Sequence, residues 1–99
     1  MARFDLHRLS RGRGGYVVDV QSSHLDHLES RVVVPLDARV DAKPVTELHP
    51  TVVIGEARYL VMTHALASVQ RRQLGHPIGS LIAYRDSITR ALDVLLTGF

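Results

Sequence analysis

The segment TVVIGEARYLVM, residues 51–62, decides the fold class of this chain. It consists of two runs rich in β-branched and apolar residues, joined by Gly55 and Glu56. A two-residue connection that opens with glycine suits a type II′ turn, because this turn needs a positive φ at its first central position. The segment therefore predicts a β-hairpin with strands over residues 51–54 and 57–62.

Three further runs on the N-terminal side of this hairpin predict short strands. They cover residues 3–8, 16–21 and 31–36, and each places apolar side chains at alternate positions. In the last run, Pro35 has no N–H to donate to a neighbouring strand. We therefore expect this strand to end near Pro35 or to lie at the edge of a sheet.

The hydrophobic period changes on the C-terminal side of the hairpin. From about Ser80 onward, the apolar residues recur with the spacing of one helical face. They are Leu81, Tyr84, Ile88, Ala91, Leu92 and Leu95. Gly98 can end this helix. Short strands followed by one helix predict a mainly β (α+β) protein, a small antiparallel barrel or sheet with a C-terminal helix as its cap.

The end of the chain is unusually apolar, since it reads Leu95-Leu96-Thr97-Gly98-Phe99. Chain ends are normally polar and mobile. Leu95 belongs to the buried helix face, so Leu96 turns away from that face, and Phe99 lies beyond the helix. Phe99 either folds back onto the core or contacts a partner, and the residues alone leave both interpretations open.

Composition limits the class of protein. The 99 residues suffice for one domain, which we expect to span residues 1–99. Hydrophobic residues make up 45% of the chain, yet no apolar run is long enough for a membrane span or a signal peptide. There is no cysteine, which excludes disulfides and thiolate metal sites. Together these features favour the cytoplasm. The net charge of +2 is too small to indicate nucleic-acid binding by itself.

Several motifs together resemble the CcdB family of bacterial toxins over almost the whole chain. They are YVVDVQS at 16–22, RVVVPL at 31–36, ELHP at 47–50, VIGE at 53–56, MT at 62–63 and ASV at 67–69. The resemblance implies a homodimer with the SH3-like antiparallel β-barrel of the CcdB and MazF toxins and a C-terminal α-helix. It also implies the toxin of a type II toxin–antitoxin system, which acts by binding and is not an enzyme.

The same resemblance implies the partners of the toxin. In the family, the last three residues, here Thr97, Gly98 and Phe99, bind the A subunit of DNA gyrase and trap the cleaved-DNA complex. A CcdA-like antitoxin neutralises the toxin. The residues that would contact this antitoxin are His24, Leu25, Asp93 and Leu96. The toxin–antitoxin complex represses its own operon, so the toxin would bind operator DNA only through that complex.

Two other functions remain open from the sequence. The family pattern ends in Trp-Gly-Ile, and Thr97 takes the place of the tryptophan, so the chain could be an antitoxin-binding homologue with weak or no toxicity. The MazF and Kid ribonucleases share the same barrel. RNA cleavage needs an acid–base pair and a cation. The residues that could supply these groups are His7, Arg11, Arg13 and Asp19.

A metal site receives little support from the histidines. His24 and His27 are three residues apart, with Asp26 between them. Zinc usually takes three or four protein ligands, and these residues fall in a stretch between two predicted strands. We therefore expect neither a metal ion nor another cofactor.

Overall fold

One long strand, β3 (Ser30–Asp37), organises the sheet. The computed structural model describes residues 2–9, 15–38 and 47–98. Within these residues β3 pairs with β2 (Tyr16–Asp19) on one side. On its other side it pairs with β6 (Ala67–Gln70) along its first half and with β5 (Ala57–Val61) at its end. The strand therefore changes partner along its length, which curves the sheet.

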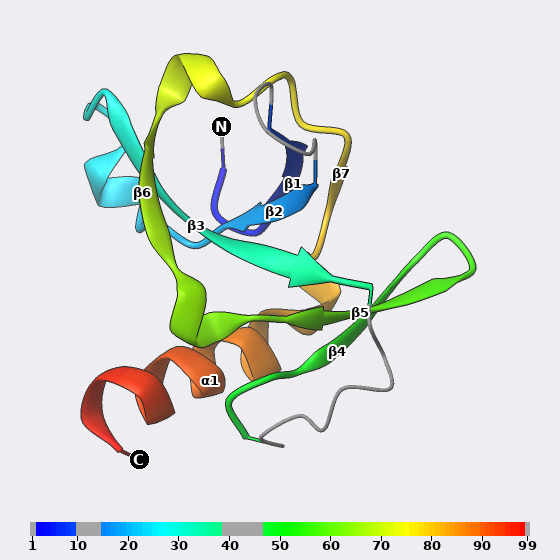
Figure 1. Cartoon of the computed structure of the whole chain (residues 1–99). Coiled ribbons are helices and arrows are strands. Elements are labelled where there is room, and N and C mark those ends of the chain that lie inside the picture. The colour runs from blue at the N-terminus through cyan, green and yellow to red at the C-terminus, as the bar shows by residue number, and fades with distance from the viewer. Residues whose placement is uncertain (1, 10–14, 39–46, 99) are drawn as a thin grey trace.

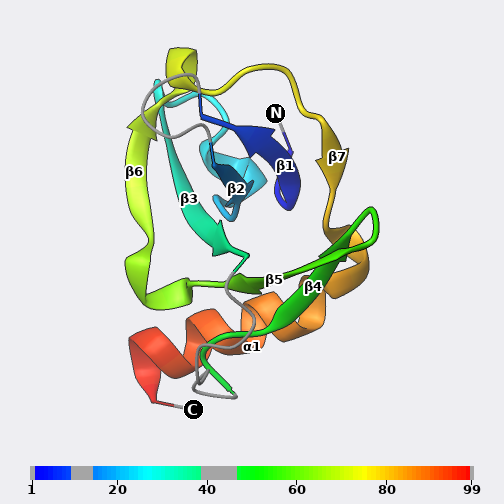
Figure 2. The ribbon, with the colours of Figure 1, turned by 45° about the vertical axis from the view of Figure 1, so that its right-hand side comes forward.

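The remaining strands extend the sheet on both sides of β3. The order is β4-β5-β3-β2-β1-β7, with β6 joined to β3 outside this path, and the described pairs are antiparallel. The outer strands are β1 (Asp5–Arg8), β4 (Thr51–Ile54) and β7 (Gly79–Ser80). Helix α1 (Arg85–Thr97) lies mostly below β5 and beside β4 in both ribbon views (Figure 1, Figure 2). The structure confirms the predicted architecture, a curved antiparallel sheet with one C-terminal helix.

The core fills the space between the curved sheet and α1. Its buried apolar residues come from both ends of the chain. They are Phe4, Leu6, Val18, Val20, Val34, Val52, Val61, Leu81 and Ile88. Ile88 and Ala91 are the residues that α1 buries. Four short 3₁₀ segments complete the described elements: η1 (Ser23–Leu25), η2 (Thr63–Ala65), η3 (Arg71–Gln73) and η4 (Ile82–Tyr84). Among the described residues, no helix is both long and apolar enough to cross a membrane.

The hairpin predicted from residues 51–62 is confirmed. Ile54 pairs with Ala57, which leaves Gly55 and Glu56 as the two turn residues. Gly55 has a φ of 63°, the positive value that a type II′ turn requires at this position. The glycine therefore sets the register of β4 against β5.

Pro35 lies two residues before the end of β3, as one of the two expected alternatives requires, and it does not lie at a sheet edge. β3 continues through Pro35 to Asp37, and Pro35 pairs with Val17 of β2 inside the sheet. The Pro35 carbonyl accepts a bond from the Met62 N–H at 3.0 Å. The N and O of a strand residue point to the same side, so the missing N–H would face the segment between β5 and β6, where β3 changes partner. The Met62 carbonyl, which lies opposite Pro35 in this register, accepts the Ala65 N–H at 2.9 Å instead, so the sheet tolerates the proline.

Two further differences concern element boundaries. The helix begins at Arg85 instead of near Ser80, because the preceding residues form η4. β6 was not predicted as a strand, since its side chains are almost all exposed and show no apolar alternation. Backbone pairing with β3 holds it in place.

Candidate functional site

An apolar groove opens between α1 and the segment that joins β2 to β3. Its cavity measures about 480 Å³. We call it the apolar groove and define it by six of its lining side chains. They are Leu25, Leu28, Val32, Leu66, Leu92 and Leu96. Leu25 is 44% exposed and Leu96 is 72% exposed, although both are large and apolar. Exposed apolar side chains gathered around a cavity typically mark an interaction surface.

The structure places the residues expected to contact an antitoxin as follows. Leu25, Asp93 and Leu96 line the apolar groove, although they lie far apart in the sequence. His24 is exposed on η1 and does not line the groove. It precedes Leu25 on the same 3₁₀ turn, where neighbouring side chains point in different directions. The structure therefore brings three of the four expected residues together.

The end of α1 leads from this groove to the chain terminus. Leu96 lines the groove and directly precedes Thr97. Thr97 and Gly98 are exposed. Gly98 has a φ of 81° and its N–H binds the Val94 carbonyl at 3.0 Å, which ends the helix in the left-handed conformation that glycine favours. Phe99, the third residue expected to bind gyrase, lies outside the described residues.

A buried charge network holds the groove wall formed by η1. The Arg31 side chain is fully buried, and its Nη2 lies 2.7 Å from the Oδ2 of Asp19, which is also fully buried. Arg31 Nη1 lies 2.8 Å from Asp26, the residue that follows η1. The hydrogen bond from Arg31 lowers the pKa of Asp26, because it stabilises the ionised carboxylate. This network ties the turn that carries Leu25 to the sheet.

A second connection to the sheet comes from Gln21, which is also buried. Its side-chain amide donates to the Leu25 carbonyl at 3.0 Å, and its side-chain oxygen accepts the Val32 N–H at 2.9 Å. Neither Arg31 nor Gln21 was expected to shape a site. Both residues stand next to a run of valines, which indicates a polar side chain at a buried strand. This pattern does not indicate which groups the side chain contacts.

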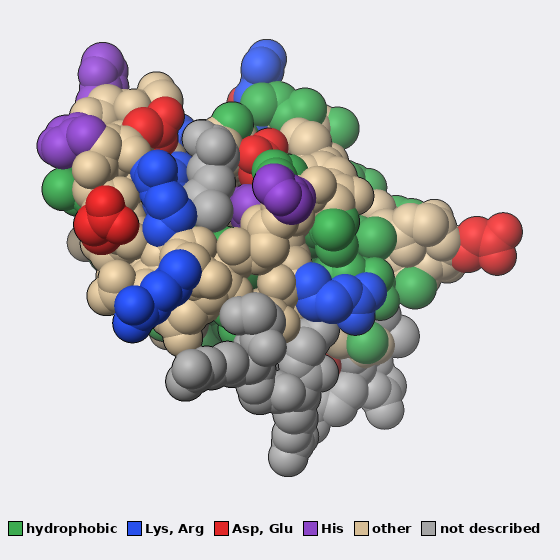
Figure 3. All heavy atoms as spheres, turned by 90° about the horizontal axis from the view of Figure 1, so that it is seen from above, with side chains coloured by type: hydrophobic (Ala, Val, Ile, Leu, Met, Phe, Trp, Pro, Cys, Tyr) green, Lys and Arg blue, Asp and Glu red, His purple; other side chains and the backbone are tan. Residues whose placement is uncertain are grey.

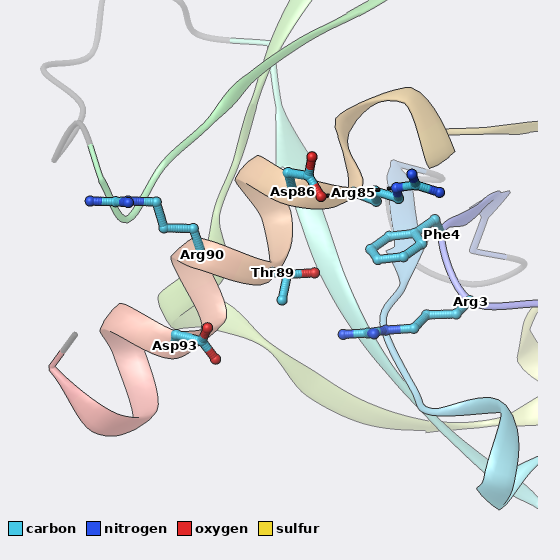
Figure 4. A pocket seen from close by; sticks show the side chains of 7 residues that line it. All are labelled: Arg3, Phe4, Arg85, Asp86, Thr89, Arg90 and Asp93. Carbon is cyan, nitrogen blue, oxygen red and sulfur yellow. Dashed lines mark ion pairs between the residues drawn. The ribbon is translucent and has the colours of Figure 1, made fainter.

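A second, more polar cavity of about 510 Å³ adjoins the first along α1 (Figure 4). We call it the basic pocket. Its lining side chains are Arg3, Phe4, Arg85, Asp86, Thr89, Arg90 and Asp93. Arg3, Thr89 and Asp93 line both cavities, so the two cavities are neighbours along α1. An apolar groove and a charged pocket thus lie side by side along α1.

The residues considered for RNA cleavage do not form an open site in the described part of the chain. His7 and Asp19 are both fully buried. His7 Nδ1 lies 3.0 Å from the Gly75 carbonyl, and Asp19 is paired with Arg31. Arg11 and Arg13 lie outside the described residues. In the space-filling view, the described side chains of both signs are interspersed on the visible face and form no single basic patch (Figure 3).

The carboxylate between His24 and His27, the pair considered for a metal site, is bound to an arginine. Asp26, which lies between His24 and His27, pairs with Arg31. Across residues 2–9, 15–38 and 47–98, no three histidine, aspartate or glutamate side chains are placed to share a metal ion.

The family model described as CcdB protein matches residues 3–98, nearly the whole chain. The chain belongs to the CcdB family. Solved structures of the same fold are toxins and ribonucleases. A Mycobacterium tuberculosis toxin, MazF-mt6, is 15% identical with a TM-score of 0.75, over 92% of this CcdB-family chain and 94% of that one. The TM-score shows a shared fold, and at this identity the likeness extends no further than the fold.

Two endoribonucleases from mycobacterial species match as well. One, solved in complex with its cognate antitoxin, is 18% identical with a TM-score of 0.79, over 97% of the CcdB-family chain and 94% of its own. The other is 16% identical with a TM-score of 0.78, over 97% and 90% of the two chains. Family and fold together class this CcdB-family protein as a toxin of a toxin–antitoxin system.

These structures also correct one expectation. The sequence resemblance implied that the chain is not an enzyme, and this expectation is wrong because endoribonucleases have the same fold. The fold therefore accommodates catalysis as well as binding. The target of this CcdB-family toxin has to be argued from its own surface.

Proposed function

We propose that this chain is a toxin that binds the A subunit of DNA gyrase through Thr97, Gly98 and Phe99, and that a CcdA-like antitoxin neutralises it by occupying the apolar groove. One observation carries the proposal. Leu96 lines the groove and directly precedes the three tail residues. A segment bound in the groove would therefore cover the base of the tail. Antitoxin and gyrase would compete for this end of α1.

The exposed leucines supply the driving force for antitoxin binding. Full burial of one leucine side chain contributes about 1.5–3 kcal/mol relative to its exposed state. Leu25, Leu28 and Leu96 are each at least 39% exposed, so a bound segment would gain a substantial part of that energy from each. The network around Arg31 reduces the cost of binding, because it fixes the groove wall in advance.

We also propose that the toxin is a cytoplasmic homodimer that takes part in repression of its operon only as a complex with antitoxin. Three large apolar side chains outside the groove support a dimer: Val53 is 47% exposed, Ile78 is 53% and Ile82 is 50%. Sedimentation at micromolar concentration should give about twice the chain mass of 11.0 kDa. A sharp monomer under these conditions would contradict the dimer.

The gyrase proposal is tested with purified protein, gyrase from the same host, supercoiled plasmid and ATP. We expect linear cleaved DNA to accumulate. Total RNA is incubated with the same preparation, because relatives of this fold are endoribonucleases. If the RNA is cleaved while the plasmid stays intact, the target of the toxin is RNA and not gyrase. If neither substrate is cleaved but the antitoxin binds, the chain is a non-toxic antitoxin-binding homologue.

The antitoxin proposal is tested by two adjacent substitutions on η1. Leu25→Ser removes a side chain that lines the groove, whereas His24→Ser removes an exposed neighbour that does not. Both variants should still poison gyrase. Only Leu25→Ser should lose neutralisation by the antitoxin encoded beside this gene. Equal loss in both variants would show that the groove is not the binding site.

A further inference from the structure

The N-terminal turn places Arg3 beside α1 through an unusual backbone conformation at Phe4. Phe4 has a φ of 73°, the left-handed region that side chains other than glycine rarely adopt. Both of its backbone groups are held: its N–H binds the Asp19 carbonyl at 2.6 Å, and its carbonyl accepts the Leu81 N–H at 2.8 Å. The Phe4 side chain is buried in the core. Strained residues of this kind concentrate at ligand-binding positions.

The Arg3 guanidinium is anchored on one side and open on the other. It stacks over the Phe4 ring, with Cζ 4.8 Å from the ring centroid. Its Nε donates to the Val20 carbonyl at 3.2 Å. Within the described residues, the two Nη atoms have no hydrogen-bond or ion-pair partner. Figure 4 shows the guanidinium extending toward α1, in the direction of Thr89 and Asp93.

The other two arginines of the basic pocket each lie within ion-pair distance of an exposed carboxylate. Arg85 lies 3.9 Å from Asp86, and Arg90 lies 3.5 Å from Glu47. Arg3 therefore differs from them in having no carboxylate within ion-pair distance among the described residues. It also lines the apolar groove as well as the basic pocket. The open donors of Arg3 are thus presented where the two cavities adjoin each other.

We propose that Arg3 binds a carboxylate of the peptide segment that occupies the apolar groove, so that this segment carries an aspartate or glutamate next to its apolar anchors. The proposal rests on the groove being the antitoxin site. Arginine presents parallel N–H donors that match the two oxygens of a carboxylate. The three arginines of this pocket outnumber its two aspartates, Asp86 and Asp93, by one, and this small excess of positive charge suits a single carboxylate and not a polyanion such as RNA.

The test is a selection of peptides. A phage-displayed library of random peptides of about twelve residues, long enough for three helical turns, is selected on the wild-type protein, on Arg3→Gln and on Arg72→Gln. Arg72 is an exposed arginine on η3 that lines neither cavity, so its variant controls for loss of one positive charge.

We expect the wild-type protein and Arg72→Gln to enrich peptides with an acidic residue at a fixed spacing from apolar residues. Arg3→Gln should retain the apolar preference and lose the acidic one. The strongest peptide is then measured by fluorescence polarisation. Replacing its acidic residue by the matching amide should weaken binding to the wild type about tenfold and should leave binding to Arg3→Gln unchanged. Arg3→Lys keeps the positive charge without the parallel N–H donors, so its affinity for this peptide should lie between those of the wild type and Arg3→Gln.

Three results would overturn the proposal. Acidic residues at library frequency among wild-type binders would show that the groove selects apolar side chains alone, and the antitoxin proposal would stand without Arg3. An acidic preference that persists in Arg3→Gln would assign it to another residue. Absence of any enriched peptide would remove the groove as a peptide site, and the gyrase assay would then decide on toxicity independently.

Discussion

Replacement of Asp19 by asparagine tests the buried charge network most directly. Asp19 and Arg31 are both fully buried, and Arg31 Nε donates to Asp19 Oδ2 at 2.8 Å. The Asp19→Asn substitution keeps the size of the side chain and removes its negative charge. Among the described residues, Arg31 would then remain buried with Asp26 as its one ionic partner. Loss of a partner of a buried charge strongly destabilises the folded state, because the remaining contacts no longer offset the cost of removing the guanidinium from water.

The expected loss can be worked out from this arrangement. Removing one partner of a buried ion pair costs about 3–5 kcal/mol. The bond between Arg31 and Asp26 remains, so we expect the lower end of this range, about 3 kcal/mol. In a domain of this size each kcal/mol shifts the thermal midpoint by about 4–8 °C. The midpoint of Asp19→Asn should therefore fall by about 12–24 °C.

The assay is thermal unfolding followed by circular dichroism. All variants are measured at one protein concentration, because the proposed dimer would make the midpoint concentration-dependent. Asp26→Asn is the matched control. It removes the other partner of the same arginine, but the Asp26 side chain is 45% exposed, so its loss should be clearly smaller. Equal losses in the two variants, or a fall of less than about 4 °C in Asp19→Asn, the shift expected for 1 kcal/mol or less, would refute the reasoning.

Three further predictions concern pH and the chain end. The bond from Arg31 lowers the pKa of Asp26 below its usual 3.8, so ionised Asp26 stabilises the fold above that pH. The wild type should therefore lose more stability than Asp26→Asn as the pH falls below 3.8, which acid titrations of the thermal midpoint measure. Deleting Gly98 and Phe99 removes an exposed residue and the last residue of the chain, so the thermal midpoint should stay within a few degrees while gyrase binding is abolished. An unfolded product would instead show that Phe99 is a core residue. Thr97→Trp should tighten gyrase binding by about 1–3 kcal/mol in calorimetry, because a large aromatic side chain is then available for burial. Unchanged affinity would show that the contact with gyrase lies elsewhere.

Local sequence patterns predicted most of the secondary structure. The turn at Gly55 and the alternation of apolar residues in residues 51–62 correctly placed β4 and β5. The spacing of Ile88, Ala91 and Leu92 correctly indicated a helical face. These features depend on residues a few positions apart, and a period of two or of 3.6 is visible in one chain without knowledge of its neighbours. β6 was missed because only its pairing with β3 makes it a strand.

The candidate site was predicted in part. The resemblance to the CcdB family singled out Leu25, Asp93 and Leu96, and the structure brings them to one groove. It also singled out His24, which the structure places outside that groove. Adjacent residues on a 3₁₀ turn face different directions, so a sequence match shared by two neighbours does not tell which one faces the cavity.

The sequence by itself therefore determined the fold class, the hairpin register and the helix, because each follows from local periodicity and turn chemistry. Only the tertiary structure decided that Pro35 lies inside the sheet, that Arg31 is buried between two aspartates, and that Arg3 faces the helix near residue 93. Periodicity tells which face of an element is buried. It carries no information about which distant element covers that face, because that depends on the strand order and on the packing of α1 against the curved sheet.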